Sequence, residues 1–209
     1  MKIAITGIHT GIGKTVATSM LAEALGADYW KPVQAGMEER DSDVLMKLLT
    51  NGPARVHPEA VCLTQPMSPH AAAAIDNVEV DYKKFKWPIT TKVLLVETAG
   101  GILSPMSDDS TMADFIAYFK LPTILITQNY LGSINHTLMS IEVLKNRGIK
   151  ILGLVINGAA YPSSESFIEQ YAGIPVLARI PHFETLTQKT IHAAALEIRQ
   201  ALQQQLGVV

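Results

Sequence analysis

Short apolar runs alternate with longer amphipathic stretches along most of the 209-residue chain. Most of the short runs are almost continuously hydrophobic, which is typical of strands buried on both faces of a sheet. The predicted strands are KIAIT (2–6), DYWKPV (28–33), KVLLVET (92–98), TILIT (123–127), KILGLVIN (150–157) and PVLARI (175–180). The longer stretches predict helices over Lys14 to Leu25, Ser42 to Leu49, Met112 to Phe119, Ile134 to Asn146, Ser163 to Tyr171 and Thr187 to Gln205.

This order of strands and helices indicates an α/β protein with a mostly parallel, doubly wound sheet that is flanked by helices. The chain has no repeat, charge block or low-complexity linker, so we expect a single domain over residues 1–209. Residues 52–91 are harder to interpret: they contain a short alanine-rich helix and the exposed segment KKFKWPITTK. In sheets of this kind ligands bind beyond the carboxyl ends of the strands. Candidate functional residues are therefore those that directly follow each strand.

The composition of the chain mainly excludes certain classes of partner and location. The chain is 48% hydrophobic and 17% charged with a net charge of −2, so we expect no nucleic-acid partner. A single cysteine, Cys62, allows no internal disulfide and favours a packed thiol in a reducing compartment. No apolar run reaches the roughly 18–20 residues of a membrane span, and the chain begins with a strand-like segment. We therefore expect a cytoplasmic protein that makes no use of a membrane.

The first turn, TGIHTGIGKT (6–15), ends in the Gly-Lys-Thr of a phosphate-binding loop. Its first glycine, Gly7, stands one residue earlier than the usual spacing requires. The alternative is a strand–helix turn without a ligand, but the position between the first strand and a helix favours nucleotide binding. Lys14 would then reach the outer phosphates, and the Thr15 hydroxyl would bind Mg²⁺.

Three further strand ends carry charged side chains. Lys31 is either a lysine with a solvated head group or a cation that stabilises a transferred phosphoryl group. Glu97 follows the apolar run KVLLV, where an unpartnered carboxylate would be costly, so we expect it to hold Mg²⁺. Asp41 and Asp43 stand at a helix start, where they either cap the helix or bind the metal.

Two asparagines are ambiguous on local grounds. Asn157 ends a strand and either reads an adenine edge or forms an Asn-Gly turn. Asn135 and His136 open a helix after Gly132 and Ser133, and such a helix start could bind a carboxylate. We expect the His136 imidazole itself to be a helix-surface group.

Taken in order, several motifs resemble the dethiobiotin synthetase family of P-loop NTPase fold. They are TGIHTGIGKTVA, KPVQAG, DSD at a helix start, PMSPHAAA, VETAGG, LGSINHTL, IN at 156–157 and IPHF at 180–183, and they cover most of the chain. The family's loop also has one residue more than the standard spacing. The additional residue in this chain is thus a point of similarity.

The resemblance implies an ATP- and Mg²⁺-dependent cyclo-ligase of biotin biosynthesis. In that reaction 7,8-diaminononanoate (7,8-diaminopelargonate) takes up CO₂ as a carbamate. ATP converts the carbamate to a carbamic-phosphoric anhydride, and the second amine closes the ureido ring of dethiobiotin. The family is homodimeric, with the substrate bound near the subunit interface.

The same resemblance implies roles for individual residues. Lys14 and Lys31 would be catalytic, and Thr15, Asp43 and Glu97 would hold Mg²⁺; Asp43 is preferred to Asp41 because the family places its aspartate just after the serine. The residues implied for ATP are Gly11, Ile12, Gly13, Lys14, Thr15, Val16, Asp43, Glu97, Gly100, Asn157, Gly158, Pro181, His182 and Phe183. The residues implied for the substrate are Ala35, Gly100, Ser133 and Asn135.

The chain departs from the family pattern at four positions. Ala35 stands where many members have a serine or threonine that touches the substrate, which puts substrate affinity in question. Thr98 replaces a common glycine, Gly11 replaces an acidic residue of some members, and Gly158 stands where an aspartate is often found. The missing hydroxyl at position 35 removes no metal or phosphate role.

Two other functions are compatible with the fold. A nucleotide switch of the partition-ATPase kind usually has a signature lysine where this chain has His9. Another ATP-dependent ligase or small-molecule kinase would share the loop, but KPVQAG together with VETAGG disfavours it. Dethiobiotin formation is the function that we expect.

Overall fold

The computed structural model describes residues 1–207, so the last two positions of the predicted domain lie outside the described residues. A seven-stranded sheet in the order β11-β10-β9-β1-β6-β2-β4 forms its centre, and all its neighbouring strands are parallel. The strands are β1 (Lys2–Gly7), β2 (Asp28–Trp30), β4 (Val56–His57), β6 (Leu94–Glu97), β9 (Thr123–Gln128), β10 (Ile151–Asn157) and β11 (Val176–Ile180). The predicted parallel α/β architecture is confirmed.

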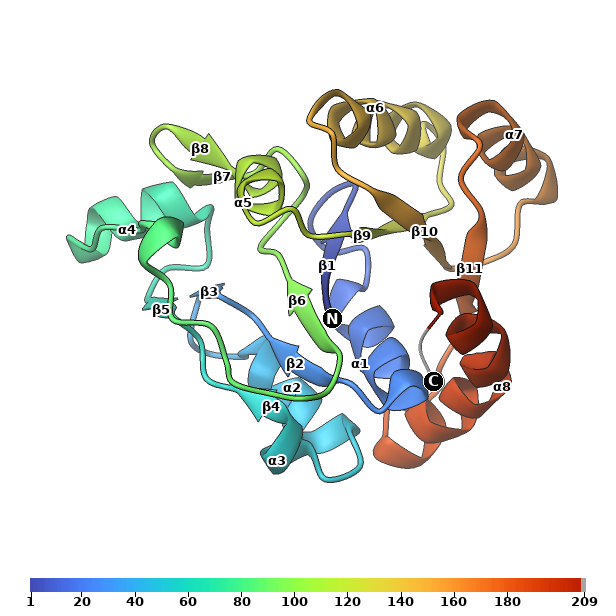
Figure 1. Ribbon diagram of the computed structural model, residues 1–209, viewed down its shortest axis with the longest axis horizontal. Helices are drawn as coiled ribbons and strands as arrows, with labels where there is room; N and C mark the ends of the chain where they lie inside the picture. Colours follow the sequence, from blue (N-terminus) through green and yellow to red (C-terminus); the bar gives the residue numbers. More distant parts are fainter. Residues whose placement is uncertain (208–209) are drawn as a thin grey trace.

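Helices cover both faces of this sheet (Figure 1). They are α1 (Lys14–Leu25), α2 (Asp41–Leu48), α3 (Gly52–Arg55), α4 (Pro69–Asp76), α5 (Met112–Tyr118), α6 (Ser133–Asn146), α7 (Pro162–Ala172) and α8 (Gln188–Leu206), with the 3₁₀ turn η1 (Tyr82–Lys84). Two small sheets complete the fold: parallel β3 (Val33–Ala35) with β5 (Val61–Leu63), and antiparallel β7 (Pro105–Ser107) with β8 (Ser110–Thr111). Among the described residues, no helix has the length and apolarity that crossing a membrane requires.

Strand side chains alternate between two cores. Ile3 and Ile5 of β1 pack with α1, α2 and α8, whereas Ala4 between them faces the core shared with α5, α6 and α7. This alternation follows from the two-residue period of a strand. Both cores are apolar, which explains why the strands appear in the sequence as continuous hydrophobic runs.

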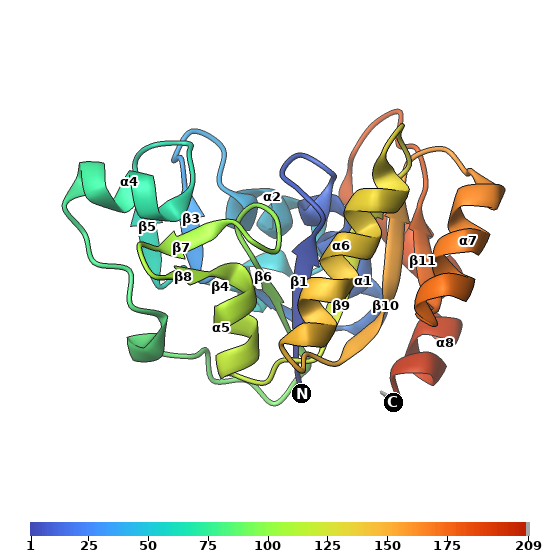
Figure 2. The ribbon, with the colours of Figure 1, turned by 90° about the horizontal axis from the view of Figure 1, so that it is seen from above.

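The carboxyl ends of the central strands meet along one edge of the sheet (Figure 2). Strand β1 lies between β6 and β9, with Ile5 opposite Glu97 and Gly7 opposite Ile126. Because these strands run in the same direction, the loops after Gly7, Glu97 and Gln128 come to the same edge. This edge is where ligands of parallel α/β sheets bind.

The predicted strand 28–33 is wrong in its second half. Strand β2 ends at Trp30, and the chain leaves the central sheet before β3 begins at Val33. Pro32 has no N–H to donate, and its carbonyl instead accepts hydrogen bonds from Ala60 and Val61, 2.9 and 3.0 Å away. The lysine between the two strands is thereby placed at the edge of the sheet.

Candidate active site

The β1–α1 loop has the backbone of a phosphate-binding turn. Gly13 is the N-cap of α1 with φ 82°, and Gly11 has φ 79°, so both adopt the left-handed conformation that glycine accommodates best. A Cβ on Gly13 would lie 2.5 Å from Nδ2 of Asn157. The backbone N–H groups of a helix N-terminus that follows such a glycine turn can bind an anion.

Thr15, Asp41, Glu97 and Lys31 converge beside this loop. The Thr15 hydroxyl donates a hydrogen bond to Asp41 and lies 3.2 Å from Oε1 of Glu97. Lys31 forms an ion pair with Asp41. These residues come from α1, α2, the end of β6 and the β2–β3 connection, so only the folded chain brings them together.

The two lysines are almost completely buried. Lys14 and Lys31 are each 7% exposed, and Glu97 is 1% exposed. Burial lowers the pKa of both ammonium groups, while the negative charge of Glu97 opposes that shift. The result is a desolvated pair of cations next to carboxylates, a setting in which an incoming anion is strongly favoured.

The aspartate at this site is Asp41 rather than Asp43. Asp43 pairs with Arg40, whose Nη2 and Nε lie 2.7 and 2.8 Å from the carboxylate oxygens. The hydrogen bond to Arg40 lowers the pKa of Asp43. Asp41, which the sequence left open as an alternative, contacts both Thr15 and Lys31. The geometry therefore favours Asp41 as the aspartate that faces the metal.

The donor set suits Mg²⁺. Oε2 of Glu97 is buried without a hydrogen-bond partner, and the hydroxyl of Thr15 and the carboxylate of Asp41 lie beside Oε1. Magnesium prefers oxygen donors and in nucleotide sites takes one or two carboxylates together with phosphates and water. Among residues 1–207, no group of three or more His, Cys, Asp or Glu side chains is placed so that it could hold a metal ion.

A cavity of about 960 Å³ adjoins the other side of the loop. Its lining includes residues that the sequence analysis assigned to the nucleotide, namely Val16, Asn157, Gly158, Pro181, His182 and Phe183. Asn157 is fixed by a 2.9 Å hydrogen bond from its Nδ2 to the carbonyl of Ile12. The ends of β10 and β11 therefore bring these residues to one place beside the loop.

A second cavity of about 790 Å³ opens between the β1–α1 loop and α6. Its walls are largely apolar and include Ile8, Ile102, Leu138 and Met139, with Asn135 at its edge. We call this cavity the apolar groove. Besides these apolar walls, its lining includes the polar side chains of His9, Thr10 and Glu142.

The remaining predicted substrate residues, Ser133, Gly100 and Ala35, do not line the apolar groove. Ser133 is buried at the start of α6, and Gly100, with φ 70°, packs against Ser104 and Thr10. Ala35 lies on β3 opposite Leu63 and does not line the groove. Thr98, a departure from the family pattern, is explained by its 2.9 Å hydrogen bond to the buried hydroxyl of Thr6.

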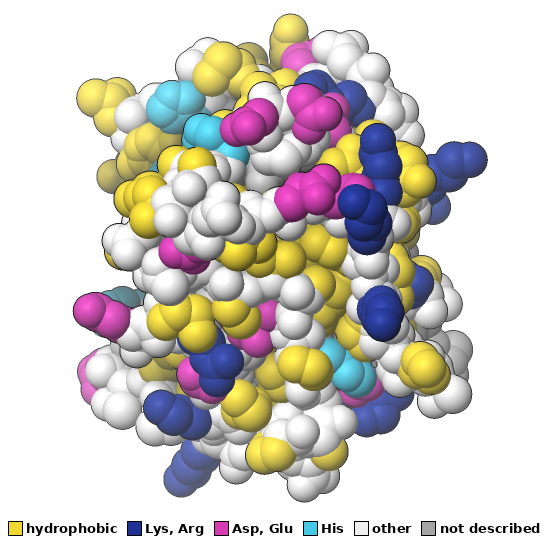
Figure 3. Space-filling model, turned by 90° about the vertical axis from the view of Figure 1, so that its left-hand side faces the viewer, with side chains coloured by type: hydrophobic (Ala, Val, Ile, Leu, Met, Phe, Trp, Pro, Cys, Tyr) yellow, Lys and Arg dark blue, Asp and Glu magenta, His cyan; other side chains and the backbone are white. Residues whose placement is uncertain are grey.

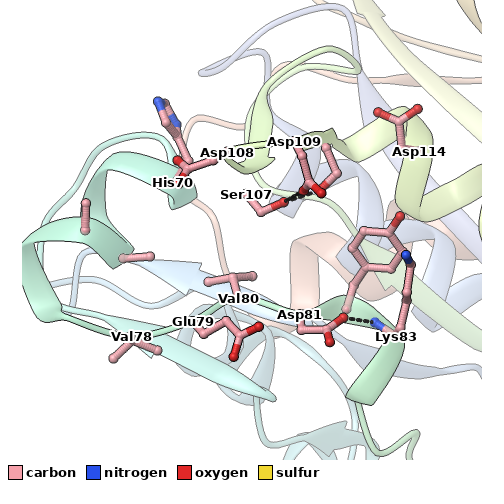
Figure 4. Close-up of a pocket in the computed structure, with 14 residues that line it drawn as sticks. His70, Val78, Glu79, Val80, Asp81, Lys83, Ser107, Asp108, Asp109 and Asp114 are labelled. Carbon is pink, nitrogen blue, oxygen red and sulfur yellow. Dashed lines mark hydrogen bonds between the residues drawn. The ribbon is translucent and has the colours of Figure 1, made fainter.

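A third cavity, of about 630 Å³, lies away from this edge between α4, η1 and β7–β8 (Figure 4). Its lining includes five acidic residues, Glu79, Asp81, Asp108, Asp109 and Asp114, together with His70 and Lys83. On the face that carries α4, acidic side chains gather in the upper half and Lys or Arg side chains lie to their right (Figure 3). None of the residues assigned to the nucleotide, the metal or the substrate lines this cavity.

Comparison with known proteins shows close relatives. Residues 1–190 match the family model described as an AAA domain. The chain is 43% identical over 198 residues to the ATP-dependent dethiobiotin synthetase BioD of Cytophaga hutchinsonii, covering 94% of this chain and 96% of the relative. It is 45% identical over 189 residues to that of Christiangramia forsetii, covering 88% and 91%.

Solved structures share the fold at low sequence identity. The septum site-determining protein MinD of Pyrococcus horikoshii, complexed with Mg-ADP, superposes with a TM-score of 0.58 at 18% identity, covering 100% of this chain and 98% of that one. The MinC:MinD complex of Aquifex aeolicus gives a TM-score of 0.56 at 12% identity, covering 99% and 95%. At such identities the likeness shows the architecture alone.

Proposed function

Because the chain belongs to the ATP-dependent dethiobiotin synthetase family, we propose that its active site closes the ureido ring of dethiobiotin from a diamino acid, CO₂ and MgATP. It is an ATP-dependent ligase of biotin biosynthesis, as the sequence analysis predicted. The observation that carries the mechanism is the convergence of Lys14, Thr15, Lys31 and Glu97 at the phosphate-binding loop.

The nucleotide would bind with its phosphates on the β1–α1 loop. The N-terminus of α1 and the ammonium of Lys14 supply positive charge where the phosphates carry negative charge. The adenine would enter the cavity that includes Asn157 and Phe183, which offers an amide and an aromatic ring. In this arrangement the γ-phosphate would point toward Lys31 and the apolar groove.

Thr15, Asp41 and Glu97 would hold the magnesium ion. When bound, Mg²⁺ neutralises charge on the β- and γ-phosphates and orients them for transfer. The ion pair between Asp41 and Lys31 indicates that Asp41 also keeps the Lys31 ammonium within the site. The earlier assignment of this role to Asp43 remains untested, but its pairing with Arg40 supports Asp41 instead.

The reaction requires cations around anionic groups and no protein nucleophile. One substrate amine adds to CO₂ and loses a proton, which forms a carbamate. A carbamate oxygen attacks the γ-phosphorus, and the bond to ADP breaks. The second amine then attacks the carbamoyl carbon, loses its proton and expels phosphate as the ring closes. Lys31 and Lys14 would stabilise the carbamate and the transferred phosphoryl group through charge.

The apolar groove would hold the alkyl chain of the substrate. Its diamine end would lie near the loop, and its carboxylate would meet the start of α6 around Ser133 and Asn135 of a neighbouring subunit. Leu131 next to that helix start is fully exposed at 103%, and Leu103 and Met139 are about half exposed, which supports a homodimer through this face. The proposed location is the cytoplasm, where Cys62 would stay reduced.

A coupled assay tests the function. The purified protein is supplied with ATP, Mg²⁺, bicarbonate and 7,8-diaminononanoate, and dethiobiotin and ADP are measured together. We expect equal amounts of both products, and ATP turnover that falls to background when the diamine is omitted. ATP turnover independent of the diamine would favour a nucleotide switch.

Lys31→Ala should reduce turnover by at least about 100-fold without unfolding the chain. The control is Lys86→Ala, which replaces an exposed lysine and should leave turnover unchanged.

A further inference from the structure

Tyr29 is a buried tyrosine, and packing alone does not require its hydroxyl. Its side chain is completely buried in the core beneath α1, with Ile3, Ile5 and Leu95. Among the described residues its Oη has no hydrogen-bond partner. Buried tyrosines usually bond their hydroxyl, and a phenylalanine would fill the same space without the cost of desolvation.

The strand register puts Tyr29 on the same face of the sheet as Glu97. Tyr29 of β2 lies opposite Leu95 of β6 in the parallel ladder. Residues two apart on a strand share a face, so Glu97 follows Leu95 on the face that Tyr29 occupies. Burial raises the pKa of the Tyr29 phenol, and the negative charge of Glu97 raises it further. Two buried polar side chains therefore share one face of neighbouring strands, and each has a polar atom without a hydrogen-bond partner among the described residues.

The two groups complement each other chemically. Oε1 of Glu97 lies 3.2 Å from the Thr15 hydroxyl, and Oε2 has no partner among residues 1–207. The phenol is rigid, because it turns about only two side-chain bonds and is enclosed by the core. A hydrogen-bond donor on a rigid ring can fix the orientation of a carboxylate. Hydrogen-bond partners of metal-binding side chains generally orient them in this way.

We propose that Tyr29 is a positioning residue that donates a hydrogen bond to Glu97 and aims its carboxylate at the metal beside Thr15. The inference rests on the proposed function for the identity of that metal. Tyr29 acts through Glu97 and touches neither nucleotide nor substrate.

Metal binding tests the proposal without requiring turnover. Mn²⁺ is titrated into the protein with ADP present, and free Mn²⁺ is followed by electron paramagnetic resonance. We expect Tyr29→Phe to weaken Mn²⁺ binding about 10-fold and to leave thermal unfolding nearly unchanged. The matched control is Tyr82→Phe, since Tyr82 packs against Phe115, 5.9 Å between ring centres, away from the site.

A double-mutant cycle identifies the group through which Tyr29 acts. Glu97→Gln alone should weaken Mn²⁺ binding. Adding Tyr29→Phe to this variant should weaken binding no further, because both changes disrupt the same oriented carboxylate. Mn²⁺ affinity of Tyr29→Phe within twofold of wild type would overturn the proposal. So would additive effects, or a Tyr29→Phe chain that fails to fold. If Tyr29→Phe weakens Mn²⁺ binding in a protein that makes no dethiobiotin, only the proposed function fails.

Discussion

Asp41 and Asp43 show how helix geometry separates two residues that look equivalent in sequence. Both stand in the first turn of α2, two positions apart. Successive residues of an α-helix are rotated by about 100°, so side chains two apart point to different sides. Asp41 consequently faces Thr15 and Lys31, whereas Asp43 faces outward and pairs with Arg40.

The two aspartates provide a matched pair of variants. We expect Asp41→Asn to raise the Mg²⁺ concentration for half-maximal activity about 10-fold, because it removes one charged oxygen from the metal site. Asp43→Asn should change it by less than twofold, since it loses only a surface ion pair. Magnesium titrations of dethiobiotin formation measure both. A larger effect at Asp43 would restore the original assignment.

At the scale of elements, the β1–α1 loop combines two requirements at Gly13. The residue has a left-handed φ, and it passes within contact distance of Asn157 from the distant strand β10. The loop therefore depends on the absence of a side chain both for its backbone conformation and for its packing against the nucleotide cavity. The sequence motif indicated only the first requirement.

Gly13→Ala should weaken ATP binding by at least about 10-fold, since relieving the clash with Asn157 must shift the loop or the nucleotide cavity. The control is Gly26→Ala. Gly26 also has a left-handed φ, of 62°, but a Cβ there meets nothing within 4 Å. It should cost about 1 kcal/mol of stability and leave ATP affinity unchanged. Isothermal titration calorimetry measures the ATP affinity of both variants, and thermal unfolding measures their stability. Equal ATP affinities of the two variants would contradict the role given to Gly13.

At the scale of the whole molecule, Glu23 joins three helices far apart in sequence. Buried on α1, it accepts hydrogen bonds from Arg55 of α3 at 2.8 Å and from the Thr50 backbone at 3.2 Å. It also lies 2.8 Å from Nδ1 of His192 on α8. Burial opposes ionisation, but these partners together lower the pKa of Glu23 from 4.5 to about 2.

This carboxylate makes stability depend on pH. Its folded pKa is depressed, so its contribution is complete above pH 4.5 and is lost as the pH falls toward 2. Glu23→Gln should cost about 3 kcal/mol at pH 7, because Arg55 then stays buried without a charge partner. In urea unfolding, the difference in the free energy of unfolding between wild type and variant should decrease as the pH falls below 4.5. A difference that does not change with pH would show that Glu23 does not contribute to the loss of stability in acid.

The proposed dimer makes a second prediction at this scale. Leu131→Glu places a charge on the face beside the groove and should convert the dimer to a monomer, because a charge in an interface core must be desolvated. Ile89→Glu is the control, since Ile89 is 99% exposed but lies in the loop after η1. Sedimentation velocity distinguishes the outcomes. A wild-type monomer, or a Leu131→Glu variant that stays dimeric, would contradict the proposed interface.

Local patterns were sufficient for most of the fold. Six of the strands in the central sheet and the longer helices lie where hydrophobic periodicity placed them, because burial on one or both faces imposes that periodicity. The segments that escaped prediction are short. Strands β3, β5, β7 and β8 have two or three residues each, and such pieces are stabilised by distant partners and carry little periodic signal.

The sequence by itself determined the parallel α/β class, the phosphate-binding loop, the family and its reaction, because these depend on local periodicity and on ordered motifs. Only the tertiary structure decided that Asp41 rather than Asp43 meets Thr15, and that Tyr29 shares a face of the sheet with Glu97. Those relations depend on strand order and on the rotation of side chains about a helix. Both arise when distant segments pack, so no local pattern records them.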